Sequence, residues 1–78
     1  MGRSSPGADE QQSLGRAIRR ARMRRNLSQI ELAVLLGMHR TQLGHIEQGR
    51  KDVRLSSLLR IAHALEIPAS MLVRSAEL

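Results

Sequence analysis

Two short segments separated by three residues constrain the fold of this chain most strongly. They run from Gln29 to Leu36 and from Arg40 to Glu47, with Gly37-Met38-His39 between them. Ser28 and Glu31 have the spacing of a capping box, in which each residue satisfies a backbone N–H group of the other. Gly37 suits the left-handed residue that commonly ends a helix. The sequence therefore predicts two short helices that meet at a tight corner.

The residues around this corner have the sizes that two crossing helices require. Ala33 is small where the second helix must pass close to the first. Apolar residues recur at helical spacing and would attach both helices to the rest of the chain; these are Leu32, Leu36, Met38, Leu43 and Ile46.

The rest of the chain also has helical periodicity. One helix is expected from Ser13 to about Asn26, with Leu14, Ala17, Ile18 and Ala21 on one face. Another is expected from Leu55 to Leu65, and Pro68 fits the first position of a fifth helix. No segment alternates apolar and polar residues, so the expected fold is all-α with five helices.

The chain has 78 residues, which suits one small domain. Residues 1–12 lack periodicity and are expected to form a disordered arm, and residues 13–78 the folded domain. Basic arms can enter a minor groove, but Arg3 alone supports that role here. The longest apolar run, Leu32 to Leu36, is too short to span a bilayer, and no secretory segment is visible, so a cytoplasmic location is expected.

Composition narrows the classes of partner. The formal net charge is +6, and such a surface attracts polyanions, chiefly nucleic acid or an anionic membrane surface. Aromatic residues make up 0% of the chain, which disfavours folds that stack single-stranded bases on aromatic rings. There are no cysteines, and the three histidines lack a ligand-like spacing, so no metal or other cofactor is expected. No motif indicates an enzyme.

Three stretches together carry a specific resemblance. They are Leu27-Ser28-Gln29 with Leu32-Ala33 and Leu36-Gly37, then Ile46-Glu47-Gln48-Gly49-Arg50, and Leu58-Leu59-Arg60-Ile61-Ala62. In this order and spacing, they resemble the helix-turn-helix of the Cro and phage-repressor family, also called the xenobiotic-response-element family. The resemblance runs from Leu14 to Val73. It implies a lambda-repressor-like domain in which helices two and three form the DNA-binding motif.

The resemblance implies that the third helix enters the DNA major groove. Its expected base-contacting residues are Arg40, Thr41, Gln42, Gly44 and His45. Arg40 can donate two N–H groups to one guanine. Gln42 has two open roles, a contact to adenine or phosphate and a cap on its own helix. Gly44 is unusual inside a helix and either permits close approach to a base or is a tolerated defect.

Further residues are expected to hold the phosphate backbone, which positions the protein without selecting sequence. They flank the third helix and are Gln29, His39, Gln48, Arg50, Lys51 and Arg54. In contrast, the resemblance implies that Arg22 and Glu47 form a buried structural ion pair. The remaining arginines of the first helix are expected to be a solvated face.

A single recognition helix contacts few base pairs, so a two-fold dimer on a palindromic operator is expected. Candidate interface residues are Leu59, Ile67, Met71 and Val73. The leading hypothesis is a transcription regulator, a repressor or an autoregulatory controller, similar to the small controllers of restriction–modification systems. Double-stranded DNA and a second copy are its expected partners, with no membrane and no small-molecule ligand. The alternative is an antitoxin that neutralises a toxin and binds DNA secondarily.

Overall fold

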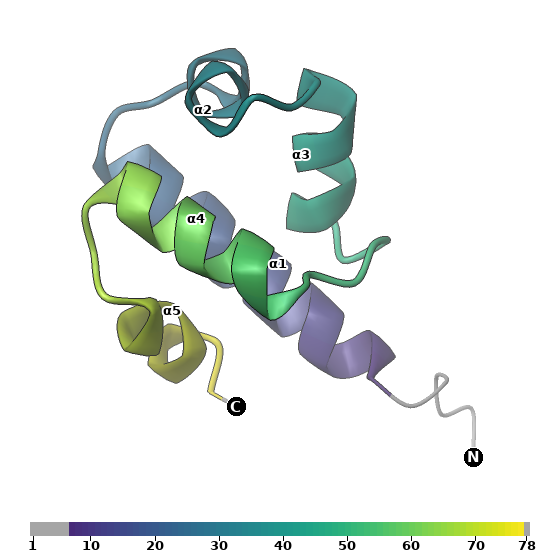
Figure 1. Cartoon of the computed structure of the whole chain (residues 1–78). Helices are drawn as coiled ribbons and strands as arrows, with labels where there is room; N and C mark the ends of the chain where they lie inside the picture. The colour runs from purple at the N-terminus through teal and green to yellow at the C-terminus, as the bar shows by residue number, and fades with distance from the viewer. Residues whose placement is uncertain (1–6, 78) are drawn as a thin grey trace.

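The computed structural model describes residues 7–77 and contains five α-helices in that range (Figure 1). They are α1 (Ala8–Arg24), α2 (Gln29–Leu36), α3 (Arg40–Glu47), α4 (Leu55–Leu65) and α5 (Ala69–Ser75). The described residues contain no strand, so the expected all-α, five-helix fold is confirmed. None of these helices is long and apolar enough to cross a membrane.

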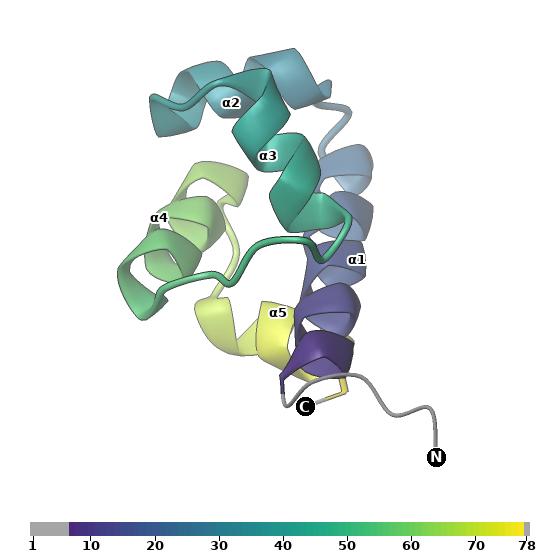
Figure 2. The ribbon, with the colours of Figure 1, turned by 90° about the vertical axis from the view of Figure 1, so that its right-hand side faces the viewer.

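The helices surround one core (Figures 1 and 2). Helices α2 and α3 lie on one side of α4, and α5 lies on the opposite side. The longest helix, α1, packs against α3, α4 and α5. This arrangement leaves the outer face of α3 uncovered: α3 lies at the right-hand edge of the molecule in Figure 1 and faces the viewer in Figure 2.

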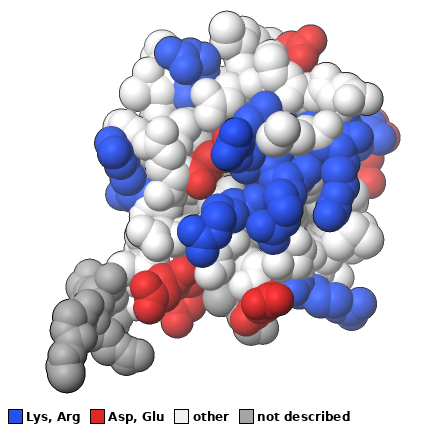
Figure 3. Space-filling model, turned by 180° about the vertical axis from the view of Figure 1, so that it is seen from behind, with Lys and Arg blue, Asp and Glu red and all other residues white. Residues whose placement is uncertain are grey.

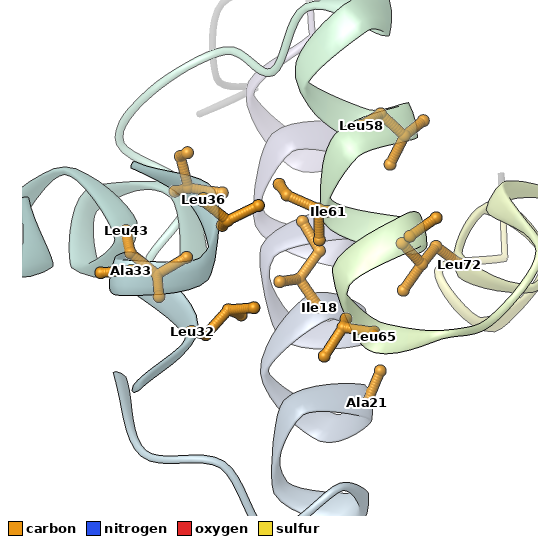
Figure 4. Packing of buried hydrophobic residues seen from close by; sticks show 12 residues of the cluster. Ile18, Ala21, Leu32, Ala33, Leu36, Leu43, Leu58, Ile61, Leu65 and Leu72 are labelled. Atoms are coloured by element: carbon orange, nitrogen blue, oxygen red, sulfur yellow. The ribbon is translucent and has the colours of Figure 1, made fainter. Parts of the chain in front are cut away.

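The core is entirely aliphatic and takes at least one side chain from every helix (Figure 4). Its most deeply buried large members are Ile18, Leu32, Leu43, Ile61, Leu65 and Leu72. Burying each such side chain stabilises the fold by about 1.5–3 kcal/mol. Leu43 and Ile46 are the residues through which this core directly holds α3.

Local interactions define both ends of α2. The Ser28 hydroxyl accepts from the Glu31 N–H at 3.0 Å, and the Glu31 carboxylate accepts from the Ser28 N–H at 2.7 Å. Gly37 ends α2 with a φ of 67°, a left-handed conformation that glycine adopts without strain. The predicted capping box and glycine turn are both confirmed.

Two predicted boundaries are wrong. The first helix begins at Ala8 instead of Ser13, so residues 8–12 are helical and do not belong to a disordered arm. Asp9 and Glu10 lie in its first turn, where their negative charges interact favourably with the helix dipole and stabilise the helix. Residues 1–6, including Arg3, lie outside the described residues. Pro68 precedes α5 as its N-cap instead of occupying the first helical position.

A glycine lies where α1 crosses the end of α3. A Cβ atom at Gly15 would lie 2.6 Å from the Glu47 carbonyl oxygen and even closer to that of Ile46. These are backbone atoms, so they cannot rotate away as a side chain can. The close approach of α1 to the last turn of α3 therefore requires glycine at this position.

We expect Gly15→Ala to lower the free energy of unfolding by about 1–3 kcal/mol, because the added methyl group overpacks this crossing. Gly44→Ala is the matched control. A Cβ there would lie 3.8 Å from the Gln29 amide nitrogen, an ordinary contact, so this change should stabilise its helix by about 1 kcal/mol. Urea denaturation measures both. Equal stabilisation by the two substitutions would contradict the close crossing.

Candidate nucleic-acid interface

One face of α3 is exposed and the opposite face is buried. Leu43 and Ile46 point into the core, whereas Arg40, Thr41, Gln42 and His45 are exposed and Gly44 is partly exposed. The five residues expected to contact bases are thus accessible on a single helix. An α-helix is about 10–12 Å in diameter, similar to the about 12 Å width of the major groove.

The sequence left two roles open for Gln42, a contact to DNA or a cap on its own helix, and the structure shows the capping geometry. Its side-chain oxygen accepts from the His39 backbone N–H at 3.0 Å. This bond ties the first turn of α3 to the preceding residue, so the Gln42 oxygen is already engaged at the start of the helix.

A buried ion pair joins α1 to the end of α3. The Arg22 guanidinium donates to both oxygens of the Glu47 carboxylate, at 2.7 and 3.1 Å. It also donates to the Leu27 carbonyl at 2.8 Å. The two side chains are 10% and 2% exposed. The structure thus contains the Arg22–Glu47 pair that the family resemblance implied, and it holds three segments together.

Gln29 extends this pair toward the exposed face of α3. Its amide donates to Glu47 at 3.0 Å, and its side-chain oxygen lies 3.5 Å from an Arg40 nitrogen, a weak contact. The sequence suggested only a phosphate contact for Gln29. Its link to Glu47 was missed, because the 18-residue separation along the chain gives no local signal.

The loop after α3 carries the other expected phosphate-binding residues. Arg50, Lys51 and Arg54 are all exposed, as are His39 and Gln48. The Arg50 backbone N–H donates to the His45 carbonyl at 2.9 Å, which fixes where the loop leaves the helix. Lys51 and Arg54 border a hollow of about 330 Å³ together with Gln42.

The four expected interface residues do not form one exposed patch. Leu59 and Met71 are about half exposed, at 51% and 49%. Ile67 and Val73 are partly buried and pack against the core. Leu59 borders a hollow between α2 and α4, whereas Met71 borders another between α1 and α5.

Basic side chains also gather over α1, on the face seen in Figure 3. On the α5 side of this helix, Arg20 donates to the Ser75 carbonyl at 2.9 Å. Beyond its end, Arg25 forms an exposed ion pair with Glu66 at 2.9 Å. Among the described residues, no cluster of histidine, aspartate and glutamate has the arrangement of a metal site.

Comparisons with known proteins agree with this geometry. The helix-turn-helix family HTH_3 matches residues 18–72, and the chain belongs to this family. The control protein C.SmaI of Serratia marcescens is 40% identical over 57 residues, covering 73% of this chain and 68% of that protein.

Two solved structures are also similar. The restriction-modification controller protein C.AhdI from Aeromonas hydrophila is 35% identical, with a TM-score of 0.77, and the match covers 81% of this chain and 96% of that one. The clp gene regulator ClgR from C. glutamicum is 28% identical, with a TM-score of 0.86 and 87% of each chain covered. The chain is a DNA-binding transcription regulator of this helix-turn-helix family, and the expected family is confirmed.

We expect Glu47→Gln to lower the free energy of unfolding by about 3–5 kcal/mol, because it leaves the buried Arg22 charge uncompensated. This is a large share of the about 5–15 kcal/mol that stabilises a typical domain. Glu66→Gln is the matched control, since it removes an exposed pair that contributes about 0–1 kcal/mol. Chemical denaturation compares the two. A similar small effect for both would mean that the buried pair is dispensable.

Proposed function

We propose that this protein binds a palindromic operator as a homodimer and represses or autoregulates transcription. The observation that carries the proposal is the exposed face of α3, which presents Arg40, Thr41 and His45 while the opposite face is fixed in the core. Inserted into a major groove, this face meets base edges whose donor and acceptor pattern differs for each base pair.

Individual side chains have distinct expected roles. Arg40 donates to guanine, Thr41 contacts a thymine methyl group, and His45 contacts a guanine or a phosphate one turn further on. Gln42 holds the start of α3 through its oxygen and keeps its amide nitrogen as a donor. Gly44 lets the helix backbone approach the base edges.

Phosphate contacts would flank these bases and set the position of α3 without selecting sequence. They come from His39, from Gln29 and Gln48 beside the helix, and from Arg50, Lys51 and Arg54 in the following loop. Gln29 can do so while it remains bonded to Glu47, because its side-chain amide carries a second N–H group.

Dimer formation supplies the specificity that one helix lacks. Two recognition helices about 34–36 Å apart contact successive major grooves on one face of the duplex. Leu59 is the favoured centre of the interface, because it is half exposed and lines the same hollow as Leu35, which is also more than half exposed. Met71 is the second candidate, and Ile67 and Val73 support it from the core.

The similarity to two control proteins favours a controller of restriction–modification genes as the biological role. Binding at its own promoter would then set its own level. Selection of bound duplexes from a random pool, followed by footprinting, tests the proposal. Two symmetric protected half-sites are expected, and binding without sequence preference would refute it.

We expect Arg40→Ala to relax base preference at one position of each half-site, at a cost of about 1–3 kcal/mol for the preferred duplex. Arg50→Ala is the control, since loss of a phosphate contact should weaken all duplexes equally and flatten the salt dependence by about one unit per protomer. Titration of matched and single-substituted duplexes distinguishes them. Uniform weakening by Arg40→Ala would remove this residue from the base-contacting set.

We expect Leu59→Asp to convert the dimer to a monomer, because it places a charge in an apolar interface. Val34→Asp is the control, since Val34 is 72% exposed and does not line the hollow that Leu59 shares with Leu35. Sedimentation equilibrium measures the mass of each variant. Dimers in both variants, or a wild-type monomer at concentrations that occupy the operator, would contradict the assignment.

A further inference from the structure

The exposed edges of α3 border two different hollows. Gln42 and Ile46, one turn apart, line the hollow that also contains Lys51 and Arg54. Glu47 and Gln48 line another, of about 580 Å³, whose remaining lining residues come from α1 and from the start of α2. A helix in a major groove has a phosphate backbone along each side, so each hollow faces one of the two strands.

The second hollow is lined mainly by polar and positively charged side chains. It contains Arg16, Arg19 and Arg22 from α1, with Ser28 and Gln29 opposite them. The charge of Arg22 is neutralised by Glu47, to which it is bonded. Arg16 and Arg19 therefore give this hollow an excess of two positive charges.

The two arginines differ from others on the same helix. Within residues 7–77, the carboxylates in ion pairs belong to Glu47 and Glu66, and neither lies within pairing distance of Arg16 or Arg19. Arg20, in contrast, is bonded to Ser75 of α5. Arg24 lines the hollow between α1 and α5, on the other side of the helix. Arg19 and Arg24 thus line different hollows, whereas Arg16 and Arg20 share the hollow beside Ser75.

We propose that Arg16 and Arg19 bind the DNA strand that passes the α1 edge of α3, opposite the strand held by Lys51 and Arg54. The ligand is the phosphate backbone of double-stranded DNA. The inference rests on the proposed insertion of α3 into the major groove. This proposal changes the expected role of Arg16 and Arg19. Instead of a solvated face, they form one of two phosphate-binding surfaces, one on each side of α3.

The geometry favours this occupant in two ways. Gln48 and Gln29 link the hollow directly to α3, so a strand beside the recognition helix reaches both arginines without a change in the fold. Guanidinium groups also bind phosphate oxygens through paired N–H donors. Arg16 lies at the margin, because it also borders the hollow beside Ser75, whereas Arg19 lines the hollow beside α3 and does not border the one beside Ser75.

The test compares two double variants of the full chain with equal loss of charge. Arg16→Gln/Arg19→Gln should weaken binding to all duplexes alike and reduce the salt slope by about 0.9 for each lost contact, or about 1.8 per protomer. Arg20→Gln/Arg24→Gln, the control on the other side of α1, should leave the slope close to that of the wild type. Thermal unfolding confirms that both variants fold.

Phosphate ethylation interference locates the contacts directly. Ethylation of phosphates on one strand beside each recognition helix should block wild-type binding and lose its effect in the Arg16→Gln/Arg19→Gln variant only. If both variants flatten the slope equally and keep the wild-type interference pattern, the two arginines act only through overall charge, and the inference is wrong. Its failure leaves base selection by α3 intact, whereas a wild-type protein that selects no sequence would overturn the proposed function as well.

Discussion

The Arg22–Glu47 pair is the interaction on which the position of α3 depends. Arg22 binds the carboxylate with two bonds and reaches the Leu27 carbonyl with a third, so α1, the following loop and the last turn of α3 are fixed together. Gln29 adds the start of α2 through the same carboxylate. A short helix of eight residues has little stability of its own, and these contacts supply an orientation that its sequence cannot.

The features predicted well from sequence are those determined by neighbouring residues. The capping box of Ser28 and Glu31 and the turn at Gly37 depend on spacing within a few positions, and the aliphatic periodicity identifies the buried face of each helix. The Arg22–Glu47 pair spans 25 residues, and it was anticipated only through resemblance to a family.

The features missed from sequence depend on how distant segments meet. The start of α1 lacks apolar periodicity, and Gln12 instead packs against Gly49 from the loop after α3. Gly15 gives no local signal, since its requirement comes from carbonyl oxygens more than 30 residues away. Arg16 and Arg19 look like any other exposed arginines until α2 and α3 are placed beside them.

The contact at Gly15 has a consequence for how such a protein diversifies. The distance between α1 and the end of α3 is set by main-chain atoms, which are the same whatever residues occupy the outer surface of α3. Other residues can therefore replace Thr41 or His45 without changing the position of α3 against α1. If α3 contacts bases as proposed, lineages descended from one ancestral chain can thus acquire different target sites while inheriting the same scaffold.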